Sequence, residues 1–309
     1  PGRAAVFFLL PGVPRESRRE AVLRIALPNK GRLAEQALTL FEKAGLKAEA
    51  RADRALVANL GSQFQAIFVR AQDIPEFVAD GAADLGVTGA DLVAETGQSI
   101  RELLDLEFGR CHLAVAVRED SPLQDPSELA PGTRVATAFP RVTESFFRSL
   151  GLEIRVAPVS GAAEIAPHLG VAEVIVDLVS TGSTLRVNGL REIGTILKSS
   201  ARLVANPAAV DSETKGPVIA ELVTALESVT RARSKRYLMA NVPRDRLEEV
   251  KKIIPGLSGP TIVEIQNGDG RWVAAHAVVD ADEIYRSITR LKALGAEGIL
   301  VTPIERLMP

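Results

Sequence analysis

The chain has 309 residues, of which 46% are apolar, 25% charged and 4% aromatic, a composition typical of a soluble protein of two or three domains. Its net charge of −2 excludes the broad basic surface that nucleic-acid binding usually requires. The single cysteine, Cys111, excludes a disulfide framework and a multi-cysteine metal site, and it indicates a reducing, cytoplasmic location.

Residues 1–22 differ from the rest of the chain. Their apolar run, AVFFLL, lies between proline and glycine and is too short to span a membrane. The following PRESRREAV lacks the small-residue pattern of a cleavage site. We therefore expect a flexible surface extension and no membrane span.

From Leu23 onward, short apolar runs alternate with longer amphipathic stretches. The predicted strands are LRIAL, QAIFV, DLGVTG, HLAVAV, TRVATA, EIRVA and EVIVD, and predicted helices open at Arg32, Ile74, Asp91, Arg141, Gly161 and Gly182. This alternation predicts α/β units, which bind ligands beyond the carboxyl ends of their strands, where helices begin.

Polar turns follow the first three of these strands. Lys30 and Arg32 flank a glycine in the first turn, where a helix N-terminus also favours anions. Two cations there fit a polyphosphate clamp, and they also fit solvated surface charge. The next two turns contribute further candidates of the same kind, which also fit plain turns and helix caps: Arg70, Asp73, Thr88 and Asp91.

The strand EVIVD ends at Asp177 and leads into a cluster of small hydroxyl and glycine residues. This cluster is Ser180, Thr181, Gly182, Ser183 and Thr184. Hydroxyls and closely approaching N–H groups suit one phosphate, and a carboxylate before them suits the diol of a sugar. The same residue types also cap an ordinary helix, so the cluster alone leaves both interpretations open.

After residue 233 the pattern changes to strand, helix, strand, strand, helix, strand. The strands are RYLMANV, PTIVEI, RWVAAHAVV and GILVTPI, and NGDG between the second and third is a strong hairpin signal. This order predicts a ferredoxin-like α+β domain. The three histidines, His112, His168 and His276, show no metal-ligand spacing.

Five separated segments carry one further pattern: LPNKGRL, VRAQDIPEFV, DLGVTGADL, SGAAEIAPHLGVAEVIVDLVSTGSTL, and YLMANVP with PGLSGPTI. In this order they resemble the ATP phosphoribosyltransferase family in its long form, the enzymes of the first step of histidine biosynthesis. The resemblance implies transfer of phosphoribose from 5-phosphoribosyl 1-pyrophosphate (PRPP) to N1 of ATP, with release of pyrophosphate and with Mg²⁺ as cofactor.

The resemblance also assigns roles to the candidate residues. It implies that Ser180 to Thr184 hold the 5-phosphate, that Asp177 and Glu164 face the ribose hydroxyls, and that Lys30 and Arg32 meet the pyrophosphate. Arg70 would help to neutralise phosphate charge, and Asp73, Thr88 and Asp91 would shape the ATP and phosphate site. Magnesium would be carried by the substrate phosphates rather than by a dedicated protein site.

The implied architecture is a two-lobed core like that of periplasmic solute-binding proteins, followed by an ACT-like regulatory domain. The expected divisions are an extension at 1–22, one lobe at 23–110 and 207–233, a second lobe at 111–206, and the regulatory domain at 234–309. The last would bind L-histidine as a feedback inhibitor near Asn241, Leu257, Ser258 and Thr261. The resemblance also implies a homo-oligomer, dimer or hexamer, and no nucleic-acid partner.

An alternative is a non-catalytic two-lobed binding or sensor protein for an anionic small molecule. Fold alone does not separate the two functions. Two cations and a hydroxyl-rich loop that serve one cleft favour the enzyme, because a binding protein has little use for both.

Overall fold

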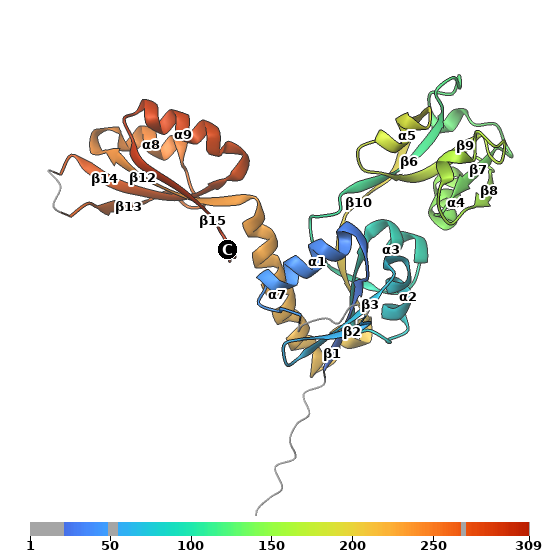
Figure 1. Ribbon diagram of the computed structural model, residues 1–309, viewed down its shortest axis with the longest axis horizontal. Coiled ribbons are helices and arrows are strands. Elements are labelled where there is room, and N and C mark those ends of the chain that lie inside the picture. The colour runs from blue at the N-terminus through green and yellow to red at the C-terminus, as the bar shows by residue number, and fades with distance from the viewer. Residues whose placement is uncertain (1–21, 49–54, 267–269, 309) are drawn as a thin grey trace, which may run out of the picture.

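The structure, a computed structural model, describes residues 22–48, 55–266 and 270–308. Three β-sheets organise these residues, with six, five and four strands. Figure 1 shows two α/β lobes and a third, separate unit, to which the long helix α7 (Lys215–Arg233) leads from the first lobe.

The first lobe is built on a six-stranded sheet of order β2-β3-β1-β4-β11-β5. Its strands are β1 (Leu23–Pro28), β2 (Val57–Leu60), β3 (Phe64–Val69), β4 (Leu85–Gly89), β5 (Arg101–Asp105) and β11 (Ala201–Ala205). β3, β1 and β4 are parallel, whereas β11 runs antiparallel to both of its neighbours. A central strand such as β1 is apolar apart from Arg24, because helices cover both faces of the sheet.

Helices on the two faces of this sheet form two apolar cores. α1 (Gly31–Lys43) and α7 bury Leu40, Phe41, Leu222 and Leu226 in the larger core. α2 (Ile74–Ala79) packs into a smaller core, and α3 (Ala90–Thr96) and α6 (Pro207–Val210) complete the lobe.

The second lobe contains a five-stranded sheet of order β10-β6-β9-β7-β8. Its elements are β6 (Cys111–Arg118), β7 (Arg134–Thr137), β8 (Arg155–Pro158), β9 (Val174–Val179), β10 (Leu190–Ser199), α4 (Pro140–Ser149) and α5 (Ser183–Val187). β7, β8 and β9 are parallel, and β6 is antiparallel to β9 and β10.

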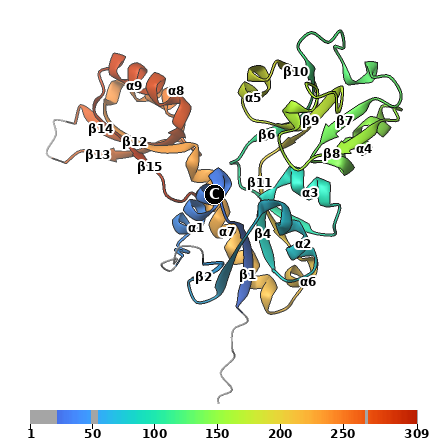
Figure 2. The ribbon, with the colours of Figure 1, turned by 45° about the vertical axis from the view of Figure 1, so that its right-hand side comes forward.

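The chain passes between the lobes twice. It leaves the first lobe between β5 and β6 and returns between β10 and β11, at Ser200 (Figure 2). From the sequence, this return was expected near Asn206, which would put Ala201–Ala205 in the second lobe. That position was wrong, because β11 pairs with β4 and β5 in the middle of the first sheet.

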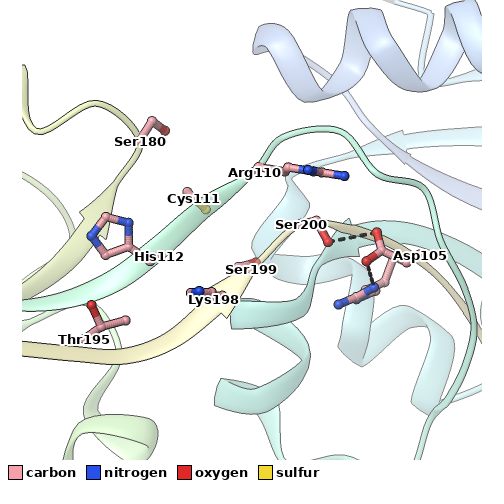
Figure 3. A pocket seen from close by; sticks show the side chains of 10 residues that line it. Asp105, Arg110, Cys111, His112, Ser180, Thr195, Lys198, Ser199 and Ser200 are labelled. Carbon is pink, nitrogen blue, oxygen red and sulfur yellow. Dashed lines mark hydrogen bonds and ion pairs between the residues drawn. The ribbon is translucent and has the colours of Figure 1, made fainter. Parts of the chain in front are cut away.

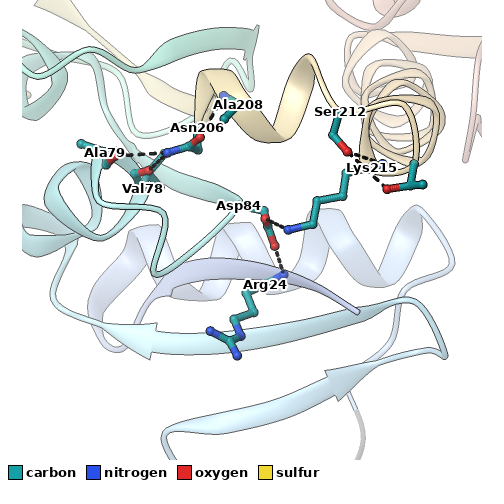
Figure 4. Close-up of polar contacts among 9 residues, drawn as sticks. Arg24, Val78, Ala79, Asp84, Asn206, Ala208, Ser212 and Lys215 are labelled. Atoms are coloured by element: carbon teal, nitrogen blue, oxygen red, sulfur yellow. Dashed lines mark hydrogen bonds and ion pairs between the residues drawn. The ribbon is translucent and has the colours of Figure 1, made fainter. Parts of the chain in front are cut away.

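Polar contacts fix the returning chain to the first lobe. The buried Asp84 carboxylate accepts from Lys215 Nζ at 2.6 Å and from the Arg24 backbone N–H at 2.8 Å. The Asn206 side chain donates to the carbonyls of Val78 and Ala79 at 2.9 and 3.1 Å (Figure 4). A buried carboxylate requires such partners, because leaving it unpaired costs several kcal/mol.

The third unit holds a four-stranded antiparallel sheet of order β13-β14-β12-β15, with α8 (Leu247–Ile253) and α9 (Ile284–Ala293) on one face (Figure 1). Its strands are β12 (Lys235–Pro243), β13 (Thr261–Glu264), β14 (Trp272–Asp280) and β15 (Glu297–Pro303). The predicted βαββαβ order is confirmed. The predicted NGDG turn falls on 267–270, of which 267–269 lie outside the described residues.

The predicted fold class, a two-lobed α/β core followed by a ferredoxin-like unit, is confirmed. Four strands, β2, β5, β10 and β11, were not predicted. The helix predicted from Gly161 is only a 3₁₀ turn, Ala163–Ile165, since Pro167 follows and disfavours continuation. No helix within the described ranges combines the length and apolar character needed to cross a bilayer.

Gly86 provides a direct test of the packing between β4 and α2. A Cβ at Gly86 would lie 2.5 Å from Ile74 Cγ2 and 2.9 Å from Val78 Cγ2. We therefore expect Gly86→Ala to lower the free energy of unfolding by about 1–3 kcal/mol, as overpacking does. Gly161→Ala is the matched control, because nothing lies within 4 Å of its added methyl. Equal thermal midpoints for the two variants would contradict this packing.

Candidate functional site

The carboxyl ends of the parallel strands in the first lobe meet at one edge of the sheet. Pro28 at the end of β1 is level with Val69 at the end of β3, and the Asn29 N–H donates to the Val69 carbonyl at 2.8 Å. The register of β4 places Thr88 at the same level. The turns that carry Lys30, Arg70 and Asp91 therefore lie beside one another.

The hydroxyl-rich loop lies at the corresponding edge of the second lobe. Val179, the last residue of β9, pairs with His112 at the start of β6, and Cys111 pairs with Ser199 at the end of β10. The loop thus follows β9 at the place where the chain crosses between lobes. The carboxyl-terminal edges of the two sheets adjoin there.

The loop itself presents its hydroxyls to solvent. Ser180, Thr181, Ser183 and Thr184 are exposed, and the Thr181 and Ser183 hydroxyls lie 3.0 Å apart. Gly182 has a φ of 69°, a left-handed conformation that favours glycine and turns the chain into α5. These groups are available to a ligand anion.

Two carboxylates adjoin this loop. Asp177 is half-buried on β9, and burial raises its pKa, an effect that the nearby Glu164 charge reinforces and the Leu178 N–H partly offsets. Glu164 lies in the 3₁₀ turn Ala163–Ile165, which packs against β9. Ala162, two residues before Glu164, has a φ of 51°, a conformation that is uncommon for a residue with a side chain and is enriched at functional sites.

Lys30 and Arg32 are exposed at the N-terminus of α1. Arg70 is also exposed, directly after β3. Within the described part of the chain, none of these three cations forms an ion pair with a carboxylate. Their charge is therefore available to an anionic ligand.

Thr88 and Asp91 do not present ligand groups to the cleft, which corrects their assignment as phosphate contacts. Thr88 is fully buried, and its hydroxyl donates to the Ala71 carbonyl at 2.9 Å. Asp91 is buried, accepts a hydrogen bond from the Ser199 hydroxyl, and has a pKa raised by burial. Both side chains stabilise the turns in which they lie. Asp73 is half-buried in the 3₁₀ turn Ala71–Asp73, which follows Arg70.

A cavity of about 510 Å³ lies where the chain crosses between the lobes (Figure 3). Its lining residues are Asp105, Arg110, Cys111, His112, Ser180, Thr195, Lys198, Ser199, Ser200 and Arg202. Only Ser180 belongs to the set predicted from sequence, and Lys30 and Arg32 do not line this cavity. Six of the others lie on β5, β10 or β11 or at Ser200 between them, none of which was predicted as a strand, whereas His112 lies on the predicted strand HLAVAV and was set aside for its lack of metal-ligand spacing.

Ion pairs hold the walls of this cavity. Asp105 accepts from the Ser200 hydroxyl at 2.8 Å and pairs with the Arg202 guanidinium. Burial alone would raise the pKa of Asp105, but the Glu107 N–H, Ser200 and Arg202 together lower it, so the carboxylate stays ionised. His112 Nε2 lies 2.7 Å from Glu192 Oε2.

The predicted histidine-site residues lie in the third unit and are exposed there. Leu257 and Ser258 precede β13, whose first residue is Thr261, whereas Asn241 lies on β12. Thr261 pairs with His276, and His276 with Met239, so Asn241 lies two strands and two residues away. The backbones of Thr261 and Asn241 are therefore at least roughly 10 Å apart across the strands. Leu257, Ser258 and Thr261 lie near one another in the sequence, and Asn241 lies apart from them.

Comparison with known proteins covers both parts of the chain. The sequence profile of a family described as ATP phosphoribosyltransferase matches residues 70–228, and one described as the HisG C-terminal domain matches 232–306. An ATP phosphoribosyltransferase of Gemmatimonas aurantiaca is 60% identical over 294 residues, which are 93% of this chain and 100% of that protein. One of Natronomonas pharaonis is 49% identical over 288 residues, with 93% and 100% covered.

The fold is also similar to a solved structure. A chain of the ATP phosphoribosyl transferase (HisG:HisZ) complex from Thermotoga maritima superposes with a TM-score of 0.61 at 28% sequence identity. The match covers 69% of this chain and 100% of that chain.

Proposed function

Because the chain belongs to the ATP phosphoribosyltransferase family, we propose that it transfers the 5-phosphoribosyl group of PRPP to N1 of ATP and releases pyrophosphate. This reaction is the first step of histidine biosynthesis. The observation that supports it best is the loop Ser180–Thr184 with the carboxylates of Asp177 and Glu164 beside it. A phosphate and a sugar diol are what these two sets of groups can hold together.

The chemistry needs electrostatic stabilisation and no nucleophilic side chain. As the bond from C1 of the ribose to pyrophosphate breaks, positive charge develops on the sugar and negative charge on the leaving group. Cations and N–H groups that are already in place stabilise such charge at little cost in reorganisation. Lys30 and Arg32 are suited to the pyrophosphate, because they form no ion pair with any described residue and lie at the positive end of α1.

The two halves of this machinery lie on different lobes. The phosphate loop follows β9 in the second lobe, whereas Lys30 and Arg32 follow β1 in the first. Closure of the lobes about their two connections would bring both halves to one PRPP molecule. It would also exclude water from an activated sugar.

The site is suited to bind Mg²⁺ together with the substrate phosphates. Among the residues with described positions, no three His, Cys, Asp or Glu side chains gather as a metal cage. Mg²⁺ commonly uses one or two carboxylates together with substrate phosphates, and Asp177 and Glu164 are such a pair. When bound, it would offset the negative charge of the pyrophosphate.

L-Histidine is the proposed inhibitor, bound in the third unit near Leu257, Ser258 and Thr261. Contacts exist through which that unit can influence the core. Arg306 donates to the carbonyl of Lys43 at 3.2 Å, at the end of the helix whose other end carries Lys30 and Arg32. Arg233, the last residue of the α7 helix that joins the first lobe to that unit, donates to the Leu106 carbonyl at 3.2 Å, in the connection between the lobes.

The direct test of the proposed reaction is to mix the protein with ATP, PRPP and Mg²⁺ and to follow pyrophosphate release and the ultraviolet spectrum of the modified adenine. We expect release that depends on both substrates. Binding of either substrate without any release would instead favour the non-catalytic binding protein.

Substitution at the N-terminus of α1 tests the roles of the cations. We expect Lys30→Ala and Arg32→Ala each to lower kcat at least tenfold, a modest effect beside the 100-fold or greater loss when one transition-state donor is removed. Lys43→Ala, at the other end of the same helix, should leave kcat within about twofold. Wild-type turnover in both Lys30→Ala and Arg32→Ala would remove these residues from the mechanism.

Point substitutions test the histidine site more cleanly than truncation, because the C-terminal tail packs against the core. We expect Ser258→Ala and Thr261→Ala to raise the inhibition constant for L-histidine roughly two- to tenfold each, the effect of one hydrogen bond. Thr289→Ala on α9 is the control, since its hydroxyl donates to the Tyr285 carbonyl within the helix. Unchanged inhibition in both site variants would place the inhibitor elsewhere.

A further inference from the structure

Lys198 is a cation of the interlobe cavity that the proposed reaction has not yet used. It lies near the end of β10 and lines the cavity together with Ser180, the first residue of the phosphate loop. Its cross-strand partner on β6 is His112, which in turn pairs with Val179, directly before Ser180. The backbones of Lys198 and Val179 are therefore two strands apart, roughly 10 Å.

The other charged groups of the cavity have partners. Arg202 pairs with Asp105 and Glu102, His112 lies 2.7 Å from Glu192, and Arg110 is 3.8 Å from Glu107. Lys198 forms no ion pair with any residue that the structure describes. Among the cations that line the cavity, Lys198 is therefore left without a compensating carboxylate within the described residues.

The backbone at Lys198 is firmly held. The next residue, Ser199, is buried and donates to Asp91, and Ser200 donates to Asp105 at 2.8 Å. Because successive side chains in a strand point to opposite faces, fixing Ser199 toward Asp91 directs Lys198 to the other face, beside His112 (Figure 3). A lysine whose backbone is fixed and whose ammonium group forms no ion pair with a described residue is well suited to bind an anion that spans the cavity.

We propose that Lys198 binds a phosphoanhydride group of one of the two substrates, the triphosphate of ATP or the pyrophosphate of PRPP, within the interlobe cavity. The proposal deepens the proposed function, since it adds a binding residue to the same site. The loop Ser180–Thr184 and Lys198 would then hold phosphate groups at neighbouring points on the second lobe. Closure of the first lobe would add Lys30 and Arg32 from the opposite side.

The test is to measure the dissociation constants of PRPP and of ATP, each with Mg²⁺, by calorimetry on the full chain. We expect Lys198→Ala to weaken one of them about tenfold or more, the effect of one charge-assisted hydrogen bond. Lys198→Arg should restore most of the affinity. Lys252→Ala on α8, the same change of charge at an exposed site, should alter neither constant.

The arms of this experiment separate the outcomes. A weaker ATP constant identifies the triphosphate as the group bound, and a weaker PRPP constant identifies the pyrophosphate. Both constants within twofold of wild type in Lys198→Ala would overturn the inference while leaving the proposed reaction intact. If the wild type binds neither substrate, the proposed function fails, and the anion site is then tested with inorganic tripolyphosphate. Weaker binding of tripolyphosphate to Lys198→Ala than to the wild type would support the anion site. Equal binding by the two proteins, or no binding to either, would overturn it.

Discussion

The pairing of β6 with β10 where the chain crosses between the lobes is the constraint on which the site depends. Cys111 is paired with Ser199 there, and the hydroxyls of Ser199 and Ser200 donate to Asp91 and Asp105 of the first lobe. These bonds fix where the second lobe begins and ends relative to the first. They place the end of β9, and hence the hydroxyl-rich loop that follows it, at the crossing between the lobes.

The distribution of charge follows from this arrangement. Buried or half-buried carboxylates lie at the connections and beside the loop, whereas cations without ion pairs within the described ranges stand at the edges that would face a ligand. A reaction that separates a cationic sugar from an anionic leaving group needs such an arrangement more than it needs any single reactive side chain. The C-terminal tail contacts the end of α1 through Arg306, and Arg233, at the end of the α7 helix that leads to the C-terminal unit, contacts the connection between the lobes. Each contact offers a physical link from the unit proposed to bind the inhibitor to the catalytic machinery.

The sequence predicted the parts of the fold that depend on local pattern. The apolar runs of β1 and β9 were predicted as strands because most of their residues are buried between the helices on both faces. The loop after β9 was recognised as a candidate site by its hydroxyl residues and glycine. β5 and β10 were missed because they are half exposed and rich in polar residues, and β10 is also bulged. The cavity was not predicted either, because residues of these two strands line it. The burial of Thr88 and Asp91 was equally hidden, since their partners Ala71 and Ser199 lie 17 and 108 residues away in the chain.

The proposed reaction requires that the hydroxyl loop of one lobe and the cations of the other bind the two ends of a single PRPP molecule. A crystal structure of the protein with PRPP and Mg²⁺ would test this arrangement. We expect the 5-phosphate within hydrogen-bonding distance of Ser180–Thr184, the ribose hydroxyls on Asp177, and Lys30 or Arg32 within about 4 Å of the pyrophosphate. A 5-phosphate bound away from that loop, or a pyrophosphate that neither cation approaches, would contradict it.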